Sequence, residues 1–395
     1  MKTISDHQEG ESLRAALPTA RRVVVKIGTR VLVRRDGRPD DRRLRALVGN
    51  LSALHAAGRD VAVVSSGAVG AGMETLGLRS RPKTVADLQM AAAVGQSRLM
   101  ARYDRLFGER GLHVGQVLLT HDGLRHRERH LNARHTLLNL LRHRIVPIIN
   151  ENDTVSVEEI RFGDNDLLAA LVSVLIEADL LVLLTTVDGL RAPASKNGRT
   201  RRIAWLPSVT PEALRLAVGK GSEFSVGGMA SKLESAQIAA GVGIPVVIAD
   251  GRRADVLSSI LEGADRGTLI GRTGSSGSSA LSRRRRWIAF FHKCSGTLIV
   301  DDGASRALVE QGKSLLPIGI RAVEGRFGPG SVVQIKDANG RLLARGQTGY
   351  GSEAILRILG RKTSEIAGIL GSKDYDEIVH RDNLAILMEP QGVPS

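Results

Sequence analysis

Apolar runs alternate with amphipathic segments along most of the chain. The apolar runs are short and rich in Val, Leu, Ile and Ala, which predicts buried strands at Arg22–Ile27, Asp60–Val64, Val114–Thr120 and Gly243–Ala249. The segments between them predict helices at Asp40–Ala57, Thr84–Phe107, Arg125–Arg144 and Ser231–Ala240. Strands that alternate with helices are typical of a mainly parallel sheet, so we expect an α/β fold.

One stretch, Pro147–Leu190, crowds carboxylates and amides between apolar segments. Its order is strand, polar loop, helix, strand and polar loop, which is a βαβ pattern. The polar residues fall in Asn-Glu-Asn-Asp at 150–153, Gly-Asp-Asn-Asp at 163–166 and Thr-Thr at 185–186. Ligands of open parallel sheets bind at the carboxyl ends of strands, so we expect the functional site here.

The pattern changes after Gly271, where a Gly/Ser-rich segment begins. Beyond it, short strands are predicted at Gly296–Val300, Ser331–Ile335 and Arg341–Gly346, and an Asn-Gly turn at 339–340 favours a hairpin. We find no internal repeat. We therefore expect a flexible tail at 1–20, an α/β domain at 21–271, a linker at 272–284, a small mostly-β domain at 285–380 and a C-terminal tail at 381–395.

Composition places the chain among globular proteins of a reducing compartment. Hydrophobic residues make up 42% of the sequence, which excludes an intrinsically disordered chain. The single cysteine, Cys294, excludes an intramolecular disulfide, and no Cys/His cluster has zinc spacing. The polar N-terminus lacks a signal sequence, and no apolar run is long enough to span a membrane. We expect a cytoplasmic protein.

The net charge of +15 allows two interpretations. A basic surface favours anionic partners such as nucleotides, acidic metabolites or RNA. The alternative is an arginine-rich surface without a dedicated partner. Arginine pairs are scattered along the chain, and this scatter favours the second interpretation over a nucleic-acid-binding face.

Two lysines occupy positions that suit phosphate binding. Lys26 lies within an apolar run, where an unpaired ammonium group is costly to bury. It either extends from a strand end into solvent or is aimed at a phosphate, and we favour the phosphate. Lys232 falls in the first turn of a helix that follows Gly227-Gly228, which is a reasonable phosphate cradle. The alternative for that segment is a flexible lid or an ordinary helix cap.

Two further small-residue segments are less specific. The loop Ser65–Gly72 lets backbone amides approach a ligand closely, although any tight turn between strand and helix has similar composition. The run Met90–Gln96 predicts close helix packing, either in the core or at a subunit interface.

The polar loops indicate phosphoryl transfer to a carboxylate. Asp164 and Asp166 lie between the two lysines in sequence, and an aspartate among lysines keeps both in place and charged. No motif places a histidine or glutamate as general base, and a carboxylate acceptor needs none because it is already ionised. Asn152, Asp153 and Asn165 suit the ammonium and carboxylate of an amino acid. Mg²⁺ would bridge the nucleotide phosphates with few protein ligands, and we expect no metal site built by the protein alone.

These motifs together resemble the glutamate 5-kinase (γ-glutamyl kinase) family, which has the amino acid kinase fold. The resemblance covers nearly the whole chain after the tail and rests on motifs at 24–29, 65–68, 93–98, 150–153, 163–166 and 227–232. The C-terminal domain resembles a PUA domain through Ser-Leu-Leu-Pro-Ile-Gly-Ile at 314–320, Gly-Tyr-Gly-Ser at 349–352 and His-Arg-Asp at 380–382. The resemblance implies a three-layer sandwich with a mainly parallel sheet, followed by a PUA-like domain.

The resemblance also implies an activity and a set of roles. Members of the family phosphorylate the side-chain carboxylate of L-glutamate with ATP and Mg²⁺, the first step of proline biosynthesis. They are usually inhibited by proline and are commonly homo-oligomers. By motif position, the catalytic residues would be Lys26, Lys232 and Asp166, and glutamate would be bound by Ser66, Gly67, Asp153 and Asn165. ATP would contact Lys26, Gly28, Thr185, Thr186, Gly227, Gly228, Met229 and Lys232.

Three positions depart from the family pattern, and two alternative functions remain open. Many members have Ser where this chain has Arg30, Asp where it has Thr186 and Thr where it has Val226. The last two positions bear on nucleotide binding. One alternative is an RNA-binding or regulatory protein that acts through the PUA-like domain. The other is a sister amino acid kinase with a different acceptor.

Overall fold

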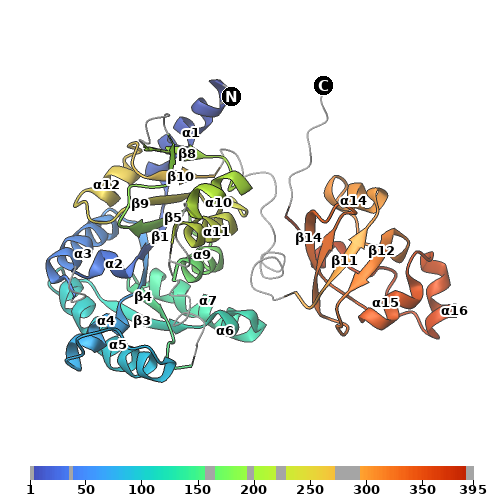
Figure 1. Ribbon diagram of the computed structural model, residues 1–395, viewed down its shortest axis with the longest axis horizontal. Coiled ribbons are helices and arrows are strands. Elements are labelled where there is room, and N and C mark those ends of the chain that lie inside the picture. Colours follow the sequence, from blue (N-terminus) through green and yellow to red (C-terminus); the bar gives the residue numbers. More distant parts are fainter. Residues whose placement is uncertain are drawn as a thin grey trace. The chain divides into compact units, whose positions relative to one another are not determined.

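The computed structural model describes residues 4–34, 39–155, 165–193, 200–218, 228–271 and 294–387. The chain divides into two compact units, residues 1–279 and 280–395 (Figure 1). The linker expected at 272–284 lies outside the described residues. Each unit has its own hydrophobic core and is described separately.

The N-terminal unit is built on an eight-stranded sheet in the order β3-β4-β2-β1-β5-β9-β10-β8. Its strands are β1 (Arg22–Ile27), β2 (Asp60–Ser65), β3 (Val114–Leu119), β4 (Val146–Glu151), β5 (Leu180–Thr185), β8 (Trp205–Leu206), β9 (Val246–Asp250) and β10 (Thr268–Ile270). Neighbouring strands from β3 to β9 are parallel, and β10 runs antiparallel to β9. The predicted mainly parallel sheet is confirmed. A separate ribbon pairs β6 (Arg191–Pro193) with β7 (Thr200–Arg202).

Helices cover both faces of this sheet. They are α1 (Ile4–Ala16), α2 (Thr29–Leu32), α3 (Asp41–Ala56), α4 (Ala68–Thr75), α5 (Val85–Gly108), α6 (His121–Arg125), α7 (Arg127–Arg142), α9 (Asn165–Leu175), α10 (Pro211–Val218), α11 (Met229–Ala240) and α12 (Val256–Leu261). Figure 1 shows α3 and α12 on one side of the sheet and α9 and α11 on the other. Within the described residues, no helix is both long enough and apolar enough to cross a lipid bilayer.

The alternation of side chains along β1 decides which face Lys26 occupies. Val23, Val25 and Ile27 belong to the core cluster that includes α3. Successive side chains of a strand point to opposite faces, so Lys26 lies on the face that α9 covers. The face that Lys26 occupies therefore follows from its place in the strand.

The close packing predicted at Met90–Gln96 lies inside the N-terminal unit. A Cβ atom on Gly95 would overlap the carbonyl oxygen of Ala68, and one on Gly72 would overlap that of Ala91. Helices α4 and α5 therefore approach each other backbone to backbone. This contact supports the loop Ser65–Gly67, which leads directly into α4.

The N-terminal segment differs from the flexible tail expected at 1–20. Residues 4–16 form α1, a 3₁₀ turn follows, and Leu13 and Leu17 are buried in the core. The guanidinium group of Arg14 donates hydrogen bonds to four backbone carbonyls, of Ala204, Ala264, Arg266 and Gly267. Sequence patterning misses this helix because its apolar stripe is sparse and its docking depends on carbonyls far along the chain.

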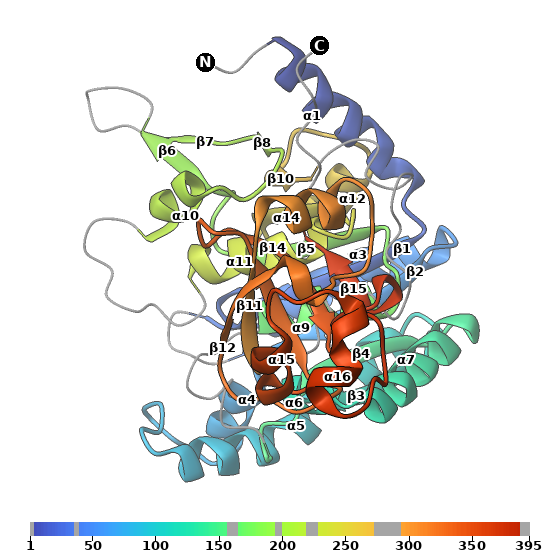
Figure 2. The same cartoon turned by 90° about the vertical axis from the view of Figure 1, so that its right-hand side faces the viewer.

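The C-terminal unit contains a five-stranded sheet in the order β12-β11-β13-β14-β15. Its elements are β11 (Gly296–Val300), α14 (Asp302–Val309), β12 (Ile320–Glu324), β13 (Val332–Lys336), β14 (Leu342–Gln347), α15 (Ser352–Ile358), α16 (Ile366–Leu370) and β15 (Leu384–Ile386). Figure 2 shows α15 beside α16, with α14 apart from both. The mostly-β second unit is confirmed. It extends past the expected end at residue 380, because β15 pairs with β14.

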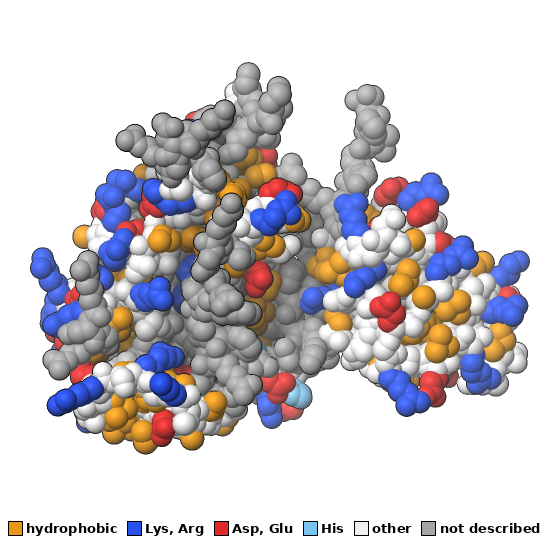
Figure 3. Space-filling model, in the orientation of Figure 1, with side chains coloured by type: hydrophobic (Ala, Val, Ile, Leu, Met, Phe, Trp, Pro, Cys, Tyr) orange, Lys and Arg blue, Asp and Glu red, His pale blue; other side chains and the backbone are white. Residues whose placement is uncertain are grey.

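The basic side chains follow the scatter seen in the sequence. On the face shown in Figure 3, Lys and Arg side chains lie apart from one another among acidic, apolar and uncharged surface, on each unit. Several arginines are paired locally, as Arg252 is with Asp250 and Arg215 with Glu212. This distribution supports the interpretation of an arginine-rich surface.

Candidate active site

Two lysines share one aspartate at the centre of the N-terminal unit. The Nζ atom of Lys26 lies 2.7 Å from Oδ1 of Asp166, and Nζ of Lys232 lies 2.8 Å from Oδ2. The two carboxylate oxygens therefore each face one ammonium group. The three residues expected to be catalytic from sequence lie together in the structure.

The fold brings these three residues together from distant parts of the sequence. Lys26 is the penultimate residue of β1, Asp166 lies in the first turn of α9, and Lys232 lies in the first turn of α11. Helix α9 packs on β1, β5 and α11. The cluster therefore sits beside the carboxyl ends of the central strands, where ligands of parallel sheets bind.

Burial makes the charges of this cluster interdependent. The side chains of Lys26 and Lys232 are about 5–6% exposed, and that of Asp166 is fully buried. A buried charge is tolerated when it is paired, and each ammonium group here faces a carboxylate oxygen. Two ammonium groups and one carboxylate leave a net positive charge in the cluster, which suits an anionic ligand such as phosphate.

Amide and hydroxyl groups surround Asn165, the residue before Asp166. Its Nδ2 atom lies 2.8 Å from the carbonyl oxygen of Ser65, 3.1 Å from Oγ of Ser66 and 2.8 Å from Oδ1 of Asn150. Asn150 in turn donates a hydrogen bond of 2.8 Å to Oε1 of Gln96. The structure thus joins two predicted substrate residues, Ser66 and Asn165, at the ends of β2 and β4.

Asp153 follows β4 and lies half-buried near a second carboxylate. Burial and the nearby charge of Glu151 raise the pKa of Asp153 to about 6, and Arg81 opposes this shift. A carboxylate held at this pKa gains from a cationic partner, and the ammonium group of an amino acid is such a partner. Asn165 bonds to Ser65, Ser66 and Asn150, whereas the charged neighbours of Asp153 are Glu151 and Arg81, so these two predicted substrate residues have different surroundings.

Two glycines lie next to residues of the candidate site, Gly67 after Ser66 in the sequence and Gly28 beside Lys26. Gly67 has φ of +110°, a left-handed conformation that favours glycine, and it caps the start of α4. A Cβ atom on Gly28 would lie 3.1 Å from the carbonyl oxygen of Leu184 and 3.9 Å from Nζ of Lys26. A side chain at Gly28 would therefore crowd the space beside the lysine.

The predicted nucleotide residues occupy two places, the end of β5 and the start of α11. Thr185 ends β5 and Thr186 follows it, both half-buried, and the Thr185 carbonyl accepts a hydrogen bond from the Gly251 amide. Gly228 is the N-cap of α11 without a side-chain cap bond, and Met229 begins the helix. Within the described residues, no side-chain cap at Gly228 occupies the first amides of α11, and amides at a helix start attract anions. Gly227 and Val226 lie outside the described residues, and Arg30 is exposed on α2.

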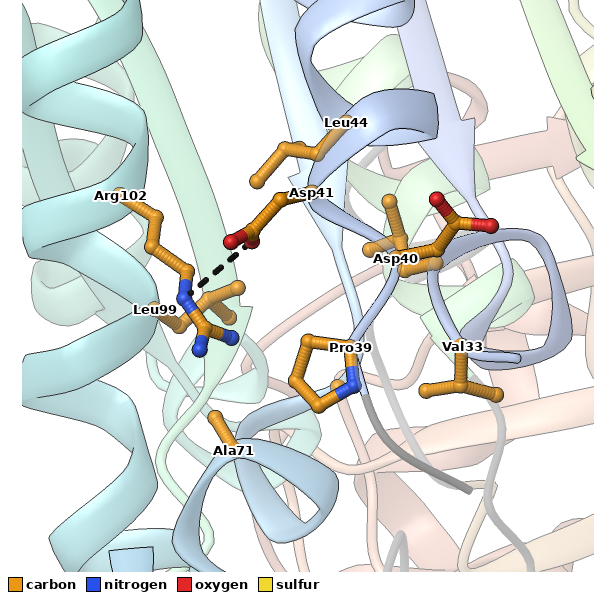
Figure 4. Close-up of a pocket in the computed structure, with 10 residues that line it drawn as sticks. Val33, Pro39, Asp40, Asp41, Leu44, Ala71, Leu99 and Arg102 are labelled. Atoms are coloured by element: carbon orange, nitrogen blue, oxygen red, sulfur yellow. Dashed lines mark ion pairs between the residues drawn. The ribbon is translucent and has the colours of Figure 1, made fainter. Parts of the chain in front are cut away.

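A small cavity lies behind Gly67, between α2, α3, α4 and α5 (Figure 4). Arg102 reaches across it to Asp41, with 3.6 Å between Nε and Oδ1. The cavity's volume of about 20 Å³ admits roughly one water molecule. The cavity is therefore too small to hold a metabolite in this conformation.

The donor chemistry of the cluster does not form a metal cage. Across the described segments, no group of three or more His, Cys, Asp or Glu side chains is placed to hold a metal ion. Asp166 directs both its oxygens to lysines. A divalent ion bound here would take its other ligands from a substrate.

Asn150 and Gln96 were not among the residues assigned roles from the sequence. Both occur in motifs that the sequence singled out, at 150–153 and 93–98. The available signal was a polar residue at the end of an apolar strand, as Asn150 is in β4. Gln96 gave no such signal, because its contact with Asn150 depends on how α5 packs.

Comparisons with known proteins agree with the sequence motifs. Residues 21–250 match the amino acid kinase family, and residues 296–370 match the PUA domain. "Glutamate 5-kinase" of Moorella thermoacetica is 49% identical over 375 residues, which are 95% of this chain and 98% of that protein. The proteins of the same name from Myxococcus xanthus and Geobacter sulfurreducens are 47% and 45% identical, and the matches cover 98% and 99% of their lengths and 95% and 94% of this chain.

Proposed function

The chain belongs to the amino acid kinase family, and we propose that it transfers the γ-phosphoryl group of ATP to the side-chain carboxylate of L-glutamate. The product is L-glutamyl 5-phosphate, which begins proline biosynthesis. The relatives named glutamate 5-kinase match this chain over nearly its whole length. The observation that carries the proposal is the buried cluster in which Lys26 and Lys232 share the carboxylate of Asp166.

The lysines act on the transferring group. A phosphoryl group in transfer carries negative charge on its equatorial oxygens, and fixed positive charges stabilise it. Lys26 and Lys232 approach from different elements, so they can contact the phosphates from two sides. Asp166 offers one carboxylate oxygen to each ammonium group, so the two lysines are arranged before the substrates bind.

The acceptor side needs no general base. The side-chain carboxylate of glutamate is ionised at neutral pH and attacks the γ-phosphorus with one of its own oxygens. The bond between that phosphorus and the β,γ-bridging oxygen breaks, and ADP leaves. We assign the binding of glutamate to Ser66, Gly67, Asp153 and Asn165, with the ionised Asp153 attracting the α-ammonium group.

The nucleotide side uses backbone and threonine groups. We assign ATP binding to Gly28, Thr185, Thr186 and the start of α11 at Gly227–Met229. The open amides at the N-terminus of α11 support a phosphate there, because a helix N-terminus attracts anions. A bound Mg²⁺ would be held through the ATP phosphates and would supply charge neutralisation there.

The remaining expectations from family resemblance stay proposals. We propose that proline inhibits the enzyme, that the chain forms a homo-oligomer, and that it works in the cytoplasm. Catalysis is assigned to residues 21–271, and the PUA-like segment at 285–380 is assigned a separate role. An RNA contact of that segment would weaken steeply with salt, which a filter-binding titration measures.

Trapping of the acyl phosphate tests the proposed function. Hydroxylamine converts an acyl phosphate into a hydroxamate, so the full-length protein with MgATP and L-glutamate is expected to give glutamyl hydroxamate. L-aspartate and N-acetyl-L-glutamate serve as competing acceptors in parallel reactions. Product from either of these, without product from glutamate, would assign the chain to a sister kinase.

A further inference from the structure

Three side-chain amides form a chain of hydrogen bonds across the acceptor side of the site. Gln96 of α5 accepts from Nδ2 of Asn150, and Oδ1 of Asn150 accepts from Nδ2 of Asn165, each at 2.8 Å. The residues come from α5, β4 and α9. We call Gln96, Asn150 and Asn165 the amide relay.

A backbone carbonyl fixes the direction of the amide relay. The Ser65 carbonyl oxygen, which accepts hydrogen bonds and cannot donate them, lies 2.8 Å from Nδ2 of Asn165. The nitrogen of Asn165 must therefore face Ser65 and Asn150. This forces the oxygen of Asn150 toward Asn165 and its nitrogen toward Gln96, so every amide in the relay has one allowed orientation.

The same orientation leaves the side-chain oxygen of Asn165 as an acceptor that a ligand could use. Oδ1 of Asn165 is buried and has no hydrogen-bond partner in the described part of the chain. Asn165 itself is fully buried. Buried polar atoms in native proteins are nearly always paired, so this acceptor indicates a donor that arrives with a ligand. At the other end of the relay, Nε2 of Gln96 is likewise buried and unpartnered within the described residues.

We propose that Gln96 is a positioning residue that makes the site selective for an acceptor with an α-ammonium group. This inference rests on the proposed function. Gln96 holds Asn150, Asn150 holds Asn165, and Oδ1 of Asn165 then accepts a hydrogen bond from the ammonium group. Without the acceptor oxygen at position 96, the Asn150 amide loses one of the two side-chain contacts that hold it. Asn150 then fixes Asn165 less firmly, and Oδ1 of Asn165 is aimed less accurately at the ammonium group, although Ser65 and Ser66 keep its direction.

Two substrates and four variants test this role in the full-length enzyme. Gln96→Met and Gln96→Ala remove the acceptor oxygen, whereas Gln96→Glu keeps one in either protonation state. Gln89→Met is the matched control, because position 89 lies about two turns earlier on the same helix. Steady-state hydroxamate formation is measured with L-glutamate and with glutarate, which is glutamate without its α-ammonium group.

The expected result separates recognition of the ammonium group from a general loss of structure. Gln96→Met and Gln96→Ala raise KM for glutamate roughly tenfold, equivalent to ~1.4 kcal/mol. In these two variants, KM for ATP and kcat stay within about twofold of the wild-type values. The value of kcat/KM for glutarate is unchanged, because glutarate has no ammonium group to bond to Asn165. Gln96→Glu and Gln89→Met behave like the wild type.

Two outcomes would overturn the inference alone. One is an equal loss on glutamate and glutarate, which indicates a structural role. The other is an unchanged KM for glutamate in whichever acceptor-free variants fold. A wild-type protein that makes no glutamyl hydroxamate would instead overturn the proposed function, and with it this role of Gln96.

Discussion

Lys26 and Asp166 form an ion pair of 2.7 Å in which both side chains are almost wholly buried. Lys26 comes from the end of β1 and Asp166 from the first turn of α9, so the packing of strand and helix sets the pair's geometry. Burying two charges is costly even when they are paired. The fold therefore maintains this arrangement at a cost in stability, which is typical of groups kept for function.

Loss of either lysine should reduce phosphoryl transfer strongly. Removal of one donor that stabilises charge in a transition state typically costs about a hundredfold or more in kcat. We expect Lys26→Ala and Lys232→Ala each to show at least this loss in the hydroxamate assay. Lys313→Ala, at an exposed lysine of the C-terminal unit, is the control and should retain normal turnover. Near-normal kcat in either site variant would remove that lysine from the mechanism.

The pKa of Asp153 predicts how glutamate binding depends on pH. Burial and Glu151 raise this pKa to about 6, so the carboxylate is ionised above pH 6 and neutral below it. Because the ionised form attracts the α-ammonium group, kcat/KM for glutamate should fall as pH drops through about 6. The carboxyl groups of glutamate titrate well below this range.

A profile of kcat/KM between pH 5 and 8 measures this effect, since it reports groups of the free enzyme. Asp153→Asn should show a higher KM for glutamate and lose the step near pH 6. An identical step in the wild type and in Asp153→Asn would assign the titration to another group.

The contact between α4 and α5 should tolerate no side chain at Gly95. A Cβ atom there would overlap the backbone of Ala68 and Gly72, and overpacking of this kind typically costs about 1–3 kcal/mol or more. We expect Gly95→Ala to lower the thermal unfolding midpoint by several degrees, at about 2–4 °C per kcal/mol. KM for glutamate should also rise, because Ala68 follows the Ser65–Gly67 loop.

Gly108→Ala is the matched control for this prediction. It lies on the same helix, and among the described residues no atom outside the adjoining backbone stands within 4 Å of a Cβ placed there. Alanine generally favours helix relative to glycine, so this change should leave the unfolding midpoint equal or slightly higher. Equal midpoints for the two variants would contradict close backbone contact at Gly95.

The sequence was enough to predict the parts of the fold that depend on local pattern. The strands β1, β2 and β5 are runs of Val and Leu that lie in the centre of the sheet, where both faces are buried. Lys26, Asp166 and Lys232 were expected together because an aspartate among lysines keeps both in place, and because the family resemblance assigns all three to catalysis by motif position.

The features that the sequence did not predict depend on contacts between distant residues. Helix α1 is held by hydrogen bonds from Arg14 to backbone carbonyls far along the chain. The sequence around Arg14 does not indicate these acceptors. The amide relay depends on one carbonyl, that of Ser65, for its direction. Strand β15 has only three residues and is recognisable through its pairing with β14.

Transfer of labelled oxygen tests the central claim, that the glutamate side-chain carboxylate is the nucleophile. L-glutamate labelled with ¹⁸O in that carboxylate is converted with MgATP, and hydroxylamine then attacks the carbonyl carbon of the product. The oxygen that bridged carbon and phosphorus leaves with the phosphate. Mass spectrometry should therefore find one ¹⁸O atom in each phosphate released. Unlabelled phosphate would show that ATP had been hydrolysed without transfer to the carboxylate, which contradicts the mechanism.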